Sequence, residues 1–139
     1  KQQFTNNLFS EKQKALEYFT TGYNCAEALL KSSKIHLTNY NDEIRKTASF
    51  FGSGMYIGEC CGVVTGALMA LGLKYAPDNP SDRLAFKKLY KKSKQFQNEF
   101  RNMFNSLNCR ELKKIHGNNC STLVKKGAEI LERIISSND

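Results

Sequence analysis

Three cysteines of this chain directly follow an asparagine: Asn24-Cys25, Asn108-Cys109 and Asn119-Cys120. Asparagine is among the strongest N-cap residues, because its side-chain oxygen accepts a hydrogen bond from a free amide of the first helical turn. The residues after each pair are typical of a first turn, so the pattern predicts three thiols at helix N-termini. Unpaired amides and the positive end of the helix dipole favour the thiolate there.

A fourth candidate lies in the segment GECCGVVTG, which contains the adjacent residues Cys60 and Cys61. Neighbouring residues on a helix point in different directions, so we expect only one of the two to face the other cysteines. A cysteine at a helix N-terminus can have a pKa of about 3.5 to 7.5, against about 8.5 when unperturbed. A single free cysteine is often just a small buried hydrophobe, but four at predicted helix starts favour shared chemistry.

The residues between the cysteines predict helices separated by short turns. Ser10, with Gln13 three residues later, forms a capping-box pattern that predicts a helix start, and Gly22 predicts its end. Further helices are predicted from Cys25, over residues 42–51, from the Cys60-Cys61 pair, over residues 81–107, and from near Cys109 and Cys120. No segment alternates with the period of a strand. We therefore expect an all-α fold, a compact single domain over residues 1–139, with about six or seven helices around a glycine-rich buried helix.

Three of these predicted helices have distinctive faces. Small residues recur every fourth position in the glycine-rich helix, at Gly58, Gly62, Gly66 and Ala70, and such a stripe lets another backbone approach closely. The long amphipathic helix presents an apolar stripe that predicts core residues: Phe86, Leu89, Tyr90, Phe96, Phe100, Met103 and Phe104. The last helix should face inward with Val124, Ile130, Leu131, Ile134 and Ile135.

The amino-acid composition limits the classes of function that this chain can have. The net charge of +8 comes mostly from lysine, and the densest cluster is Lys87, Lys88, Lys91, Lys92 and Lys94. We interpret this cluster as a solvated helix face, because the scarcity of arginine argues against nucleic-acid binding. No apolar run is long enough for a membrane span. The start of the sequence has no apolar signal core, so we expect a cytoplasmic protein, where clustered cysteines indicate redox or metal chemistry more often than structural disulfides.

The order of these elements resembles the small redox-active proteins named for their cysteine pattern, C_GCAxxG_C_C. The resemblance runs from about Phe9 to Ile135 through GYNCAEALL, FGSGMYIGECCGVVTGALMALGLKYA, FNSLNCREL and the last cysteine. It implies that the four family cysteines are Cys25, Cys61, Cys109 and Cys120. Val63 stands where the family usually has alanine, and Cys60 is an additional thiol. The family is also similar to part of certain multihaem proteins, but this chain has no C-x-x-C-H site for covalent haem.

The leading hypothesis is a thiol–disulfide redox protein, a thiol-based oxidoreductase that requires no cofactor. Cys25 or Cys61 would attack a disulfide, and Cys109 or Cys120 would resolve the mixed disulfide. The reaction partner would be a protein or small-molecule thiol, disulfide or electron donor. At least two of the four cysteines should then have Cα atoms about 4.4–6.8 Å apart.

Two alternatives remain open. The same four cysteines could bind zinc or an iron–sulfur cluster, with His116 replacing one ligand, although the short ligand pairs typical of such sites are missing. A lone histidine is more often a satisfied or solvent-facing residue, and we interpret His36 and His116 in that way. The third hypothesis is a helical interaction module whose basic face, including Lys91 and Lys92, docks an acidic redox partner.

Overall fold

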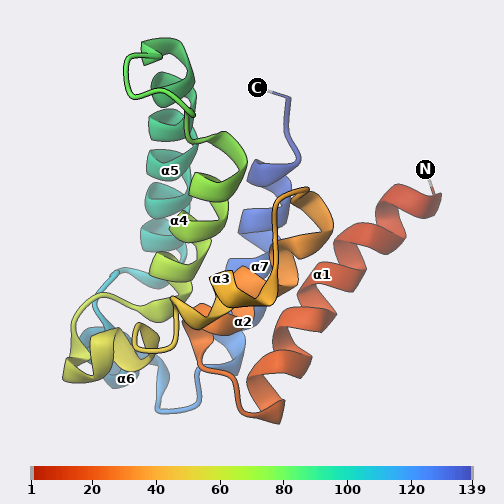
Figure 1. The fold of residues 1–139 in the computed structure, drawn as a ribbon. Helices are drawn as coiled ribbons and strands as arrows, with labels where there is room; N and C mark the ends of the chain where they lie inside the picture. Colours follow the sequence, from red (N-terminus) through yellow and green to blue (C-terminus); the bar gives the residue numbers. More distant parts are fainter. Residues whose placement is uncertain (1, 139) are drawn as a thin grey trace.

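The computed structural model describes the backbone of residues 2–138 and the side chains of residues 12–138. It confirms the all-α prediction, and residues 2–138 contain no β-strand. The helices are α1 (Gln2–Thr21), α2 (Cys25–Ser32), α3 (Asp42–Lys46), α4 (Gly62–Tyr75), α5 (Arg83–Phe104), α6 (Cys109–His116) and α7 (Ser121–Ile135) (Figure 1). Two short turns complete the set, the 3-10 turn η1 (Ser33–His36) and the π-helical turn η2 (Gly54–Gly58).

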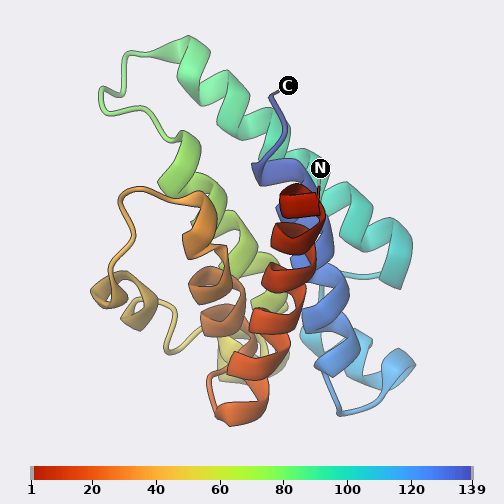
Figure 2. The same cartoon turned by 90° about the vertical axis from the view of Figure 1, so that its right-hand side faces the viewer.

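Helix α4 lies at the centre of the array. It packs against α2, α5 and α7, while α1 covers α2 and α7 from the outside. Figure 2 shows α1 and α7 side by side over much of their length. Helices α2, α4 and α7 all begin at the same end of the molecule, where α6 and η2 also lie, whereas the start of α1 and the end of α7 lie toward the other end (Figure 1). Helix starts from distant parts of the sequence therefore gather at one end.

Two residues of the predicted small-residue stripe do allow another helix backbone to approach closely. A Cβ atom added to Gly66 would lie 2.4 Å from the carbonyl oxygen of Ala26 and 2.9 Å from its Cα atom. A Cβ atom on Gly62 would lie 2.5 Å from the Cys25 sulfur. Helices α2 and α4 are therefore in backbone contact where the Cys25 end of α2 crosses α4. Gly58 differs from the prediction, because it ends η2 and faces the Arg110 guanidinium instead.

The predicted core faces are confirmed in α7 and confirmed only in part in α5. All five predicted α7 residues are buried. In α5, Phe96, Phe100 and Phe104 form a buried row at four-residue spacing. Met103 is 50% exposed, since it lies about 100° around the helix from Phe104. Phe86 and Tyr90, 43% and 56% exposed, are likewise not core residues.

Several predicted helix boundaries need correction, including both ends of the helix predicted over residues 81–107, which is the shorter α5. Helix α1 begins at Gln2, so Ser10 lies within it, because a capping pattern does not stop a helix that already continues from upstream. Helix α3 ends at Lys46 instead of continuing to residue 51, and turns cover the following residues. Helix α7 begins at Ser121, one residue later than expected.

The lysine cluster of α5 is not uniformly solvated. Lys92 is buried, and its Nζ atom donates to the carbonyl oxygens of Ile134 at 2.9 Å and Ser137 at 3.1 Å. It also lies over the ring of Tyr75, 4.9 Å from the centroid. Lys92 therefore stabilises the end of α7 and is not part of a basic docking face, while Lys87, Lys88 and Lys91 are exposed.

Candidate functional site

Cys25 is held at the start of α2 by the predicted capping box. Asn24 Oδ1 accepts from the Glu27 amide at 2.8 Å, and Glu27 Oε1 accepts from the Asn24 amide at 3.0 Å. The Asn24 side chain also donates to the carbonyl oxygens of Ala48 and Ser49. Cys25 follows directly on this turn. The bonds hold the turn against both α2 and the segment after α3, so the Cys25 sulfur has a defined position.

Cys109 and Cys61 are positioned together by one short antiparallel contact. Asn108 caps α6, since its Oδ1 atom accepts from the Glu111 amide at 3.0 Å, which confirms the second predicted cap. The Cys109 amide donates to the Glu59 carbonyl at 2.6 Å, and the Cys61 amide donates to the Leu107 carbonyl at 2.8 Å. The isolated bridge between Cys60 and Asn108 completes this contact. Consequently the start of α4 and the start of α6 lie side by side.

Cys61 and Cys120 are themselves the N-cap residues of α4 and α7. The third predicted cap was therefore wrong by one position: Asn119 precedes the N-cap and its Oδ1 atom accepts from the Ser121 amide at 3.0 Å. An asparagine side chain can accept a hydrogen bond from such an amide in a turn as well as in a helix cap. The sequence pattern therefore did not distinguish a turn at Asn119 from an N-cap. Cys120 still lies at the helix start.

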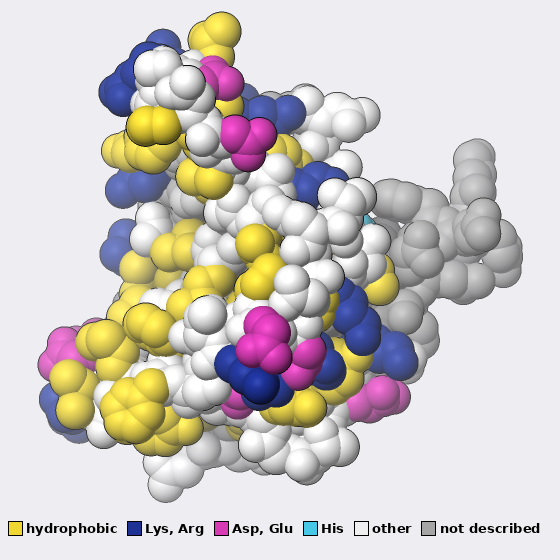
Figure 3. All heavy atoms as spheres, viewed as in Figure 1, with side chains coloured by type: hydrophobic (Ala, Val, Ile, Leu, Met, Phe, Trp, Pro, Cys, Tyr) yellow, Lys and Arg dark blue, Asp and Glu magenta, His cyan; other side chains and the backbone are white. Residues whose placement is uncertain are grey.

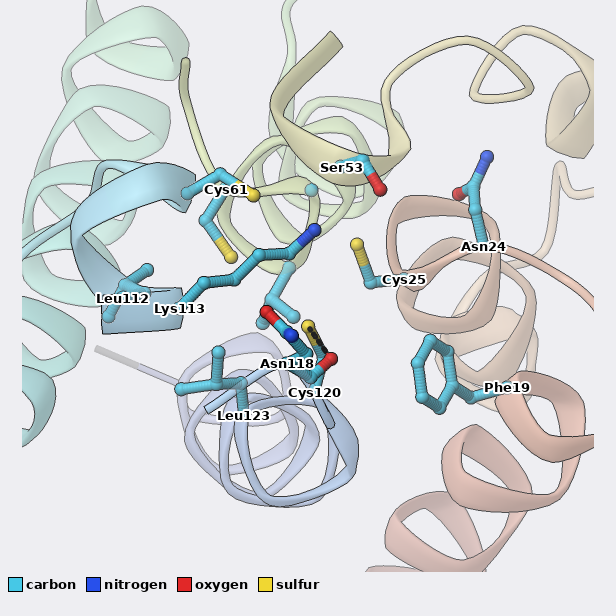
Figure 4. Close-up of a pocket in the computed structure, with 13 residues that line it drawn as sticks. Phe19, Asn24, Cys25, Ser53, Cys61, Leu112, Lys113, Asn118, Cys120 and Leu123 are labelled. Atoms are coloured by element: carbon cyan, nitrogen blue, oxygen red, sulfur yellow. Dashed lines mark hydrogen bonds between the residues drawn. The ribbon is translucent and has the colours of Figure 1, made fainter. Parts of the chain in front are cut away.

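Cys25, Cys61, Cys109 and Cys120 line one cavity of about 210 Å³. In Figure 4 the side chains of Cys25, Cys61 and Cys120 point toward a common space. Cys25, Cys61 and Cys109 are buried, whereas Cys120 is half-buried. Of the adjacent pair, only Cys61 lines the cavity, although a negative charge on Cys109 raises the pKa of Cys60 as well. All five cysteines are free thiols.

Burial reverses the predicted direction of the thiol pKa shifts. It raises the pKa of Cys25, and the amides of Ser53 and Ala26 oppose this only in part. Burial likewise raises the pKa of Cys61 well above its usual range, against the amides of Val63 and Val64. The helix ends thus act on the sulfurs as expected, but the loss of solvent outweighs them.

Lys113 is a site residue that the sequence analysis missed. Burial raises the pKa of the Cys120 thiol, and the Lys113 ammonium opposes that rise. Figure 4 shows the Lys113 side chain reaching from α6 into the space that the cysteines share. Lys113 lies four residues after Cys109, on the same face of α6. That spacing is the only signal in the sequence that could have identified it.

A left-handed turn supplies the backbone opposite Cys25. Ser53, Gly54, Met55 and Tyr56 follow one another with φ values of 48°, 61°, 62° and 58°. Such angles are costly for residues with a Cβ atom. The turn aims the Ser53 amide at the Cys25 sulfur. It leaves Tyr56 and Ile57 exposed at 52% and 60%, in the region where Figure 3 shows apolar side chains gathered near η2 and α6.

The two histidines take no part in this cavity. His116 Nε2 lies 3.2 Å from the carbonyl oxygen of Phe104, and its ring packs edge-on against that phenyl ring. His36 Nε2 lies 2.7 Å from Glu132 Oε2. Both are therefore satisfied residues, as interpreted from the sequence. Within the described side chains, no three His, Cys, Asp or Glu residues converge closely enough to hold one metal ion.

Comparison with known protein families matches residues 23–134 to the model described as "Putative redox-active protein (C_GCAxxG_C_C)". The chain belongs to this family. The match covers α2 through nearly all of α7, and with it all four cysteines of the cavity. Searches among curated proteins and among solved structures gave no match. None of the helices described is both long enough and apolar enough to span a membrane.

Proposed function

We propose that this protein exchanges thiols and disulfides, with Cys120 as the attacking thiol and Cys25 as the resolving thiol. The observation that supports the proposal is the convergence of four cysteines, from four separate helix starts, on one cavity. Cys120 is the most accessible of the four. It is also the one whose thiolate a lysine ammonium favours. The sequence had left the attacking role with Cys25 or Cys61.

Cys25 is the favoured partner because its sulfur and that of Cys120 interact. A negative charge on Cys120 raises the pKa of Cys25, and it does so more than a charge on Cys109 does. The Ser53 amide opposes the rise and assists formation of the Cys25 thiolate. Cys61 and Cys109 also interact with Cys25, so they are the thiols positioned to accept the disulfide from it in a later exchange.

The reaction balances as two successive exchanges. The Cys120 thiolate attacks one sulfur of a disulfide RS–SR, forms a Cys120–SR bond and releases RS⁻, which takes up a proton. The Cys25 thiolate then attacks the Cys120 sulfur, forms the Cys25–Cys120 bond and releases a second RS⁻. The protein loses two thiol protons and two electrons, and the substrate gains both to become two RSH.

Trapping of the mixed disulfide tests the assignment. Reduced wild-type protein, Cys25→Ser and Cys120→Ser are mixed with a small excess of bis(hydroxyethyl) disulfide and analysed by intact mass spectrometry. We expect wild type to lose two hydrogen atoms and Cys25→Ser to retain one adduct on Cys120. Cys120→Ser should react at least tenfold more slowly, because it lacks the most accessible of the four thiols. An adduct that accumulates instead on Cys60 would contradict the proposal, with Cys60→Ser as the matched control.

The alternative function, binding of zinc or an iron–sulfur cluster by the same four cysteines, has weaker support, because as placed they do not converge as a ligand set. Metal analysis and the visible absorption spectrum of anaerobically purified protein separate the two. Stoichiometric zinc, or absorption typical of an iron–sulfur cluster, would favour the alternative.

A further inference from the structure

The cavity that the cysteines line has a positively charged side chain and, among the described residues, no negatively charged carboxylate. Among its lining residues, Lys113 is the only one with a charged side chain, and neither Asp nor Glu lines it. Among the side chains that the structure describes, the Lys113 ammonium has no hydrogen-bond or ion-pair partner. Other lysines of the chain have carboxylate partners, for example Lys12 with Glu129 at 2.7 Å and Lys31 with Asp42 at 3.0 Å. The ammonium of Lys113 is thus available to an incoming ligand.

The size of the cavity limits what can enter. At about 210 Å³ it lies below the range of about 300–1,000 Å³ that is usual for drug-sized ligands. Besides Lys113 and the cysteines, the cavity is lined by apolar and small uncharged residues: Phe19, Val63, Leu112, Leu123, Gly62, Ser53, Asn24 and Asn118. The buried sulfur of Cys25 lies over Gly62, where a side chain would leave no room for it. A short aliphatic chain with an anionic end fits these surroundings.

We propose that the substrate of this site is a low-molecular-weight disulfide that carries a carboxylate, and that Lys113 binds that carboxylate. The inference rests on the thiol–disulfide function proposed above. The carboxylate pairs with the Lys113 ammonium in the cavity while the aliphatic part lies against Leu112 and Leu123. This brings one substrate sulfur to Cys120, which starts α7 beside them. The covalent steps are those of the exchange described above, with RS⁻ now a carboxylate-bearing thiolate.

Three disulfides of similar size and different charge test the inference. The rates of Cys25–Cys120 formation are compared for the dicarboxylate of dithiodipropionic acid, neutral bis(hydroxyethyl) disulfide and dicationic cystamine. Each rate is normalised to the rate of a free small thiol with the same disulfide, which removes intrinsic reactivity. We expect the normalised rate to be about tenfold higher for the dicarboxylate than for the neutral compound at low salt, and the preference to fall as salt is added.

Variants of Lys113 identify the source of the preference. Lys113→Gln also changes the thiolate fraction of Cys120 and therefore its rate with every disulfide. We therefore compare, within each variant, the ratio of the dicarboxylate rate to the neutral-disulfide rate, in which the thiolate fraction cancels. The ratio should fall to about one in Lys113→Gln, persist in Lys113→Arg, and remain unchanged in Lys114→Gln, whose side chain is exposed and outside the cavity.

The outcomes separate the two proposals. An equal normalised rate for all three disulfides, or a ratio that survives in Lys113→Gln, overturns the carboxylate inference and leaves the exchange function standing. Failure of wild type to form an intramolecular disulfide with any of the three overturns both.

Discussion

Replacement of Gly66 by alanine tests the contact that places Cys25 against α4. The added Cβ atom would lie 2.4 Å from the Ala26 carbonyl oxygen and 2.9 and 3.0 Å from its Cα and carbonyl carbons. All three are backbone atoms, so no side chain can move aside and α2 must shift by about 1 Å, the difference from an ordinary contact. Such overpacking costs up to about 3 kcal/mol.

Gly72→Ala is the matched control, since it is the same substitution in the same helix and nothing lies within 4 Å of the new atom. Both variants gain about 1 kcal/mol of helix propensity. We therefore expect Gly66→Ala to lose about 2 kcal/mol of unfolding free energy and Gly72→Ala to gain about 1 kcal/mol, a difference of about 3 kcal/mol. The free energies come from urea unfolding of the reduced protein, followed by helical circular dichroism.

The same shift should move Cys25 relative to the other cysteines. We expect Gly66→Ala to form the intramolecular disulfide more slowly than wild type, and Gly72→Ala to form it at the wild-type rate. Equal stabilities of the two alanine variants would refute the argument that α2 and α4 are in backbone contact.

Four further predictions address the thiol pKa values, the left-handed turn and the cap. Because burial raises the pKa of the Cys120 thiol, its rate of adduct formation with a neutral disulfide should still rise between pH 7 and 9 in a stopped-flow assay; a plateau below pH 7 would contradict this. The raised thiol pKa values also mean that stability is full below the unfolded pKa of about 8.5 and falls as pH rises above it, which urea unfolding at pH 7 and 10 measures. Ser53→Gly should increase the unfolding free energy by about 1 kcal/mol, since φ of 48° favours glycine, and a loss would show that the serine side chain matters more. Asn24→Ala should reduce the unfolding free energy by about 1–2 kcal/mol, more than Asn119→Ala, and equal losses would argue against the capping box.

The sequence predicted correctly those features that depend on residues close together in the chain. The caps at Asn24 and Asn108 were predicted correctly because capping involves residues within one turn. The small residues Gly62 and Gly66 predicted a close helix contact, but not which helix would make it. The start of α7 was misplaced by one residue because Asn119 forms a turn that looks like a cap.

The features that were not predictable depend on residues distant in the sequence. The pKa direction of the cysteines was wrong because burial depends on how α1, α4, α6 and α7 close around them, and no local pattern reports it. Lys113 was missed because its environment, not its type, distinguishes it from the other lysines. The left-handed angles of Met55 and Tyr56 could not be expected from residues that disfavour them.

Disulfide mapping tests the central claim most directly. Reduced wild-type protein is oxidised at low concentration with one equivalent of a neutral disulfide, alkylated, digested and analysed by mass spectrometry for linked peptides. The account predicts one dominant intramolecular link, between Cys25 and Cys120, with Cys60 alkylated. Predominantly intermolecular links, or links that involve Cys60 and leave Cys25 and Cys120 alkylated, would contradict it.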